Sequence, residues 1–116
     1  GVTLAGREAE SKAVIEAFSR RVGREPAPLA MHGYAAAKTL LNSLESAAQE
    51  GRPLSGEALR EALARSDVET PMGRVRFNEA GDPLHYERMI IQVQGGRHVI
   101  VYPPSRATAP AIYPVK

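Results

Sequence analysis

Residues 69–82 read Glu-Thr-Pro-Met-Gly-Arg-Val-Arg-Phe-Asn-Glu-Ala-Gly-Asp, and the hydrophobic period of the chain changes within this stretch. From Gly73 onward, Val75 and Phe77 alternate with arginines, which is the two-residue period of a half-buried strand. The asparagine, glycine, aspartate and proline between positions 78 and 83 are typical of a turn. The stretch therefore divides the chain into an earlier helical part and a later β part.

Upstream of this stretch, apolar residues recur with the 3.6-residue period of amphipathic helices. The first predicted helix covers residues 8–22, and the second, which is longer and richer in leucine and alanine, covers about residues 29–49. The third begins near Ser55, a favourable N-cap residue, with Glu57 in its positively polarised first turn, and it ends at residues 66–67. For the second helix we expect a buried stripe made of Leu29, Tyr34, Ala37, Leu40, Leu41, Leu44 and Ala48.

Downstream, two β-rich runs at residues 87–94 and 97–102 flank Gly95 and Gly96. Two adjacent glycines can both take the positive φ of a type I′ turn, so the sequence predicts a hairpin. Prolines at 103, 104, 110 and 114 prevent a regular ladder beyond it and favour an extended tail. The predicted fold class is α+β, with three helices followed by a three-stranded antiparallel β portion.

The predicted boundaries are 1–77 for the helical segment with the first strand, 78–102 for the hairpin segment and 103–116 for the tail. Three strands make a poor sheet alone, and an apolar hairpin requires cover on a face or an edge. The segment is therefore expected to be part of something larger.

Composition excludes several classes of protein. The 116 residues are enough for one small domain, and the lack of cysteine excludes disulfides and thiolate metal sites. The net charge is only +2 with both signs interspersed, so no basic face or run indicates a nucleic-acid partner. No apolar run approaches the ~20 residues that span a bilayer. Residues 1–6 lack the features of a signal peptide, so a signal, if the protein is exported, is expected upstream.

The residues capable of chemistry form no catalytic or metal-binding pattern. His32, His85 and His98 lie far apart on different predicted elements, without the spacing of metal ligands. Glu57 and Glu61 share a helical face, but nothing indicates the apolar pocket that would separate their pKa values. We therefore expect no enzyme, no metal and no cofactor.

Four stretches together resemble one known family. They are Phe-Ser-Arg-Arg-Val-Gly-Arg-Glu-Pro at 18–26, Gly-Tyr-Ala-Ala at 33–36, the opening stretch at 69–82, and Met-Ile-Ile-Gln-Val-Gln-Gly-Gly-Arg-His-Val-Ile-Val at 89–101. Their order resembles the C-terminal portion of type I periplasmic binding proteins, in particular the Leu/Ile/Val-binding receptors of ABC transporters. The resemblance runs from about residue 11 to residue 104. It implies roughly the last third of a two-lobed α/β periplasmic binding protein type I fold.

The resemblance implies an extracytoplasmic receptor, periplasmic or extracellular, that binds a branched-chain or other small amino acid (or amide) and delivers it to an ABC permease. The family position before the Tyr-Ala motif corresponds to Leu29, whose side chain would flank the ligand. The residue could equally be the first core residue of its helix. Tyr34 is expected to be a packed core tyrosine with a bonded hydroxyl.

Other functions stay open from the sequence. The same lobes can serve a sensor without a transport role, and a small oligomeric α+β interaction module is the alternative from another class. A basic nucleic-acid-binding domain is the weakest of the alternatives. As an isolated fragment of a receptor, the chain is expected to self-associate, because it exposes edges and apolar faces that the rest of the protein would cover.

Overall fold

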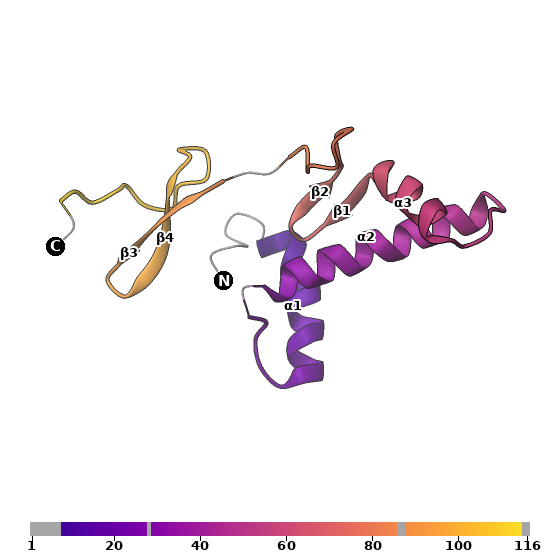
Figure 1. Ribbon diagram of the computed structural model, residues 1–116. Coiled ribbons are helices and arrows are strands. Elements are labelled where there is room, and N and C mark those ends of the chain that lie inside the picture. The colour runs from indigo at the N-terminus through magenta and orange to yellow at the C-terminus, as the bar shows by residue number, and fades with distance from the viewer. Residues whose placement is uncertain (1–7, 28, 86–87, 115–116) are drawn as a thin grey trace.

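The computed structural model describes residues 8–27, 29–85 and 88–114, with side chains from Ser11 onward, and confirms the α+β class. Three helices precede four short strands (Figure 1). Their bounds are α1 Glu8–Val22, α2 Ala30–Gln49, α3 Gly56–Ala64, β1 Val68–Thr70, β2 Gly73–Val75, β3 Ile90–Gln94 and β4 Arg97–Tyr102.

The helix ends follow local chemistry. The first helix ends where it was predicted, and the second begins one residue later than expected. At the third, the hydroxyl oxygen of Ser55 accepts a hydrogen bond from the backbone N–H of Ala58 at 3.1 Å. This contact confirms the predicted N-cap, because it satisfies one of the N–H groups that lack a partner within the helix.

The buried face of α2 differs from the predicted one. The helix buries a line of residues four apart, Met31, Ala35, Thr39, Ser43 and Ala47. The large residues of the expected stripe lie on its flanks, where Leu41, for example, stays exposed. The predicted stripe was wrong, because hydrophobic periodicity identifies the helix face that carries the large apolar residues. In α2 the buried face carries mostly small residues instead. Here α3 and β1 pack close to the helix, and a close approach of backbones favours small side chains.

Hydroxyl groups within this buried line find their partners locally. Thr39 and Ser43 each donate a hydrogen bond to the carbonyl oxygen four residues earlier, at 2.8 and 2.9 Å. The hydroxyl of Ser43 also lies 3.2 Å from that of Ser66, which follows α3. Burial of these polar groups is therefore inexpensive, because each retains a hydrogen bond.

The strands form two separate hairpins instead of one three-stranded portion. In the first, β1 and β2 are antiparallel, with Val68 opposite Val75. The side chain of Thr70 closes their turn, donating to the carbonyl of Gly73 at 2.7 Å and accepting from the N–H of Met72 at 3.1 Å. The sequence did not predict β1, since three residues are too few to show a period.

The second hairpin, β3–β4, turns at Gly95 and Gly96, whose φ angles of 56° and 75° confirm the predicted turn. Ile100 on β4 is the buried residue of this unit, with 1% of its surface exposed. The described tail is extended and packs against the hairpin: the N–H of Thr108 donates to the carbonyl of Ile100 at 2.8 Å. This contact holds the proline-rich tail against β4, although the tail forms no regular ladder with it.

The two hairpins belong to different parts of an elongated molecule. Figure 1 shows β1–β2 beside α2 and α3, whereas β3–β4 lies apart from these elements. The radius of gyration is 17.5 Å, compared with about 13 Å for a compact domain of this length. The structure thus has two small centres of burial, one around Met31 and one around Ile100, instead of a common core.

Candidate functional site

Leu29, the residue singled out by the sequence, lies at the N-terminal end of α2. It is the N-cap residue, has helical backbone angles, and makes no side-chain cap. Its carbonyl accepts the first helical hydrogen bond, from the N–H of Gly33 at 3.1 Å, while 75% of its surface stays exposed. Leu29 is therefore not a core residue of this chain, and its side chain is free to contact another molecule or another segment.

Tyr34 lies one turn further along α2 and is also more exposed than expected. With 41% of its surface accessible, it is not the packed core tyrosine that the sequence predicted. It borders a shallow, mostly apolar depression of about 370 Å³ on one flank of the helix. The depression is lined by Tyr34, Ala37, Lys38, Leu41, Asn42 and Glu45.

A second depression lies on the other flank of α2, where the helix meets α3 and β2. It has a volume of about 340 Å³ and is almost wholly apolar. Its lining comprises Ala35, Ala36, Thr39, Leu40, Leu63, Val75 and Phe77. Both flanks of α2 therefore present hydrophobic surface to solvent, and exposed surface of this kind is typical of sites that pack against something else.

Lys38 links the exposed flank to the first hairpin. Its ammonium group donates a hydrogen bond to the backbone carbonyl of Glu69 on β1 at 2.7 Å. The contact fixes the orientation of β1 against α2. Ser11 of α1 reaches the same hairpin more weakly, since its hydroxyl lies 3.5 Å from the carbonyl of Pro71.

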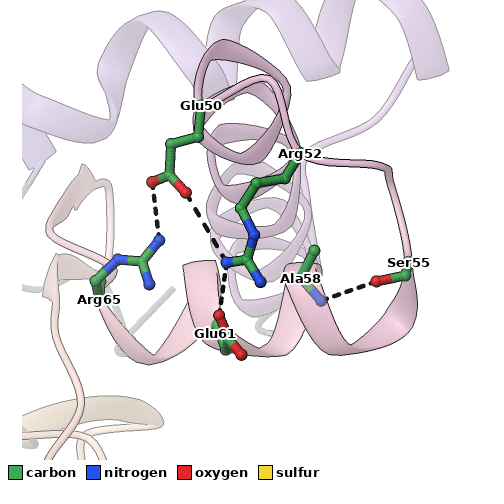
Figure 2. A network of polar contacts seen from close by, with 6 residues as sticks. All are labelled: Glu50, Arg52, Ser55, Ala58, Glu61 and Arg65. Carbon is green, nitrogen blue, oxygen red and sulfur yellow. Dashed lines mark hydrogen bonds and ion pairs between the residues drawn. The ribbon is translucent and has the colours of Figure 1, made fainter.

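Four charged residues join α2 to α3 across the loop between them (Figure 2). The guanidinium group of Arg52 lies 2.5 Å from a carboxylate oxygen of Glu61 and 4.0 Å from one of Glu50. The other carboxylate oxygen of Glu50 lies 2.9 Å from the guanidinium group of Arg65. The hydrogen bond from Arg52 lowers the pKa of Glu61 below its ordinary value, and the same bond raises the pKa of Arg52.

A further ion pair joins the end of α3 to β2. Arg74 donates two hydrogen bonds to the carboxylate of Asp67, one of them at 3.0 Å between Nη2 and Oδ2. This contact lowers the pKa of Asp67 and raises that of Arg74. Neither of these ionic contacts was predicted from the sequence. The one available signal was the opposite charges that flank the turn at Gly51 and Pro53.

The structure does not bring the candidate chemical groups together. His32, His85 and His98 lie on α2, in the connection and on β4, and the described residues hold no group of three that could bind a metal. The carboxylate of Glu61 is paired with Arg52 instead of acting with Glu57. Among the described residues, no helix is both long and apolar enough to cross a membrane.

Two comparisons with known proteins agree with one another. A family profile described as periplasmic binding protein matches residues 4–97. The structure is similar to a leucine-binding protein from Thermotoga maritima, with a TM-score of 0.58 and 25% sequence identity. The match covers 78% of this chain but 25% of that protein, so the chain spans about a quarter of its length. No curated protein sequence matches.

Proposed function

We propose a solute-binding function from the premise that the chain belongs to the periplasmic binding protein family. Within that family it is of the branched-chain amino acid receptor type. In this proposal the chain forms part of an extracytoplasmic receptor. The receptor takes up a branched-chain or other small amino acid, or an amide, and delivers it to an ABC permease. The observation that carries the proposal is the family match across residues 4–97.

The arrangement of the chain supports this role. The described residues form two units, α1 to β2 and the β3–β4 hairpin with its tail (Figure 1). Each unit leaves apolar surface uncovered. In the proposal, residues 1–77 belong to one lobe of the receptor, residues 78–102 add a hairpin to a sheet, and residues 103–116 form a tail. The activity would depend on the remaining protein as well.

Leu29 is the ligand-contacting residue that we propose within this chain. Its exposed aliphatic side chain at the start of α2 supports the proposal, because a hydrophobic contact there favours an aliphatic ligand. The ammonium and carboxylate groups of an amino acid need polar partners, which would come from elsewhere in the receptor. The isolated 116-residue chain is therefore expected to bind leucine only weakly.

The decisive experiment begins with the reading frame around the codon for Gly1. A frame that continues upstream through further α/β segments and a signal sequence supports the receptor and its extracytoplasmic location. Isothermal titration calorimetry of the encoded receptor with leucine, isoleucine and valine then measures binding. Leu29→Ala is expected to weaken binding roughly tenfold or more, because one hydrophobic contact is lost. Leu54→Ala, at another exposed leucine, is the matched control.

Two results would contradict the proposal. A frame that starts close to Gly1 would favour the small oligomeric interaction module in place of a receptor. Tight one-to-one binding of an amino acid by the 116-residue chain would show that no further lobe is required. Transport and sensing would be separated by whether permease genes adjoin the reading frame.

A further inference from the structure

The outer edge of β3 offers unpaired backbone groups, and the hydrogen bonds of β4 define their direction. Both backbone groups of Ile100 bind the tail, since its carbonyl accepts from the N–H of Thr108 at 2.8 Å and its N–H donates to the Thr108 hydroxyl at 3.1 Å. The backbone groups of Ile100 therefore point away from β3. In an antiparallel ladder, a residue opposite such a position also points its groups away from the ladder.

Ile91 lies opposite Ile100, and Val93 lies opposite His98. Because the direction of the backbone groups alternates along a strand, the N–H and carbonyl of both Ile91 and Val93 point to the outer edge of the hairpin. Within the described part of the chain, no backbone hydrogen bond from outside the hairpin reaches either residue. Two residues spaced by two, each with a free donor and a free acceptor, form the template to which another strand can be added.

The two edges of the hairpin differ in whether another segment covers them. The tail covers the edge of β4 and also crosses one face, where the side-chain amide of Gln92 exchanges two hydrogen bonds of 2.8 Å with the backbone of Ile112. The side chains of Ile91 and Val93 lie on the opposite face, with 45% and 61% of their surfaces exposed. Residues 90–94 contain no proline and no charged residue, the residue types that usually block pairing at the edge of a sheet.

We propose that the outer edge of β3 is a strand-addition site, and that in the 116-residue chain a second copy occupies it through antiparallel pairing of β3 with β3. With Ile91 of one copy opposite Val93 of the other, symmetry provides four backbone hydrogen bonds. Within residues 90–94, this register brings no two charged residues opposite each other. It also joins the apolar faces of both hairpins. The inference names the surface for self-association and does not depend on the solute-binding proposal.

Analytical ultracentrifugation over a wide concentration range tests the site. The unmodified chain is expected to form dimers. Val93→Pro removes an outward N–H that takes no part in the hairpin, and Val93→Lys adds a charge to the edge. Each substitution is expected to raise the dimer dissociation constant roughly tenfold or more. Leu41→Lys, on the exposed flank of α2, is the control and is expected to leave the dimer unchanged.

Hydrogen exchange provides a second readout that does not rely on variants. Exchange at the Ile91 and Val93 amides is expected to slow as the concentration rises, while the Gln92 and Gln94 amides, which face β4, stay constant. The proposal fails if the unmodified chain is monomeric at high concentration, or if both Val93 variants dimerise normally. It also fails if Leu41→Lys abolishes the dimer, since the flank of α2 would then be the interface.

Discussion

The corner between α2 and α3 and the β3–β4 hairpin are both small units, but they are supported in different ways. At the corner, small side chains bring the elements together, Ser55 caps α3, and four charged residues cross the loop (Figure 2). The hairpin depends on Ile100 and on the tail that binds one edge and one face. The corner is thus held by contacts among neighbouring elements, whereas the hairpin is held by its own tail.

The largest expected effect tests whether these units unfold separately. Ile100→Ala and Met31→Ala each remove a buried side chain, and such changes usually cost about 2–5 kcal/mol. In amide hydrogen exchange, Ile100→Ala should remove protection in β3 and β4 alone, and Met31→Ala in α2 and β1 alone. Ile91→Ala, at a half-exposed site in the same hairpin, is the control for the first. Loss of protection in both units from either change would show one cooperative domain.

A smaller effect is expected at the corner itself. Ser55→Ala removes the acceptor of the Ala58 N–H, and the loss of an N-cap usually costs about 1 kcal/mol. Urea unfolding followed by circular dichroism at 222 nm would measure the change. Ser55→Asp, which retains an acceptor oxygen, should restore most of the stability. Equal losses for both variants would mean that the cap contributes little.

The smallest effect concerns the ion pairs. The hydrogen bond from Arg52 holds the pKa of Glu61 below its ordinary value of 4.5, so the stabilising contribution of Glu61 is present above that value. It is lost as the pH falls through the lower pKa of the folded state, because protonation then favours the unfolded chain. The groups are exposed, so a small and salt-sensitive change is expected. Glu61→Gln should flatten this part of the pH–stability profile, and an unchanged profile would contradict the assignment.

The two regions also differ in how much of their structure could be predicted from the sequence. Local chemistry was sufficient for the C-terminal end of α1, the cap at Ser55 and the turn at Gly95 and Gly96, because each depends on a few adjacent residues. The buried face of α2 was predicted wrongly, since the neighbours that select it are distant in sequence. The strand β1 escaped detection because its partner, not its composition, defines it.

The candidate site shows the same limit. The family was recognisable because the stretch at 69–82 combines turn and strand residues in an uncommon order. The role of Leu29 stays a prediction, because an exposed side chain at the start of α2 does not by itself identify what it contacts. Exposure of Tyr34 could not be foreseen either, because an apolar stripe does not reveal whether anything covers it.

The amide of Gln92 is chemically a peptide group carried at the end of a side chain, and it pairs with Ile112 as another strand would. Together with the bonds between Ile100 and Thr108, this contact attaches the tail to both strands of the hairpin. Removal of residues 108–114 would therefore leave the backbone groups of Ile100 and the amide of Gln92 without these partners.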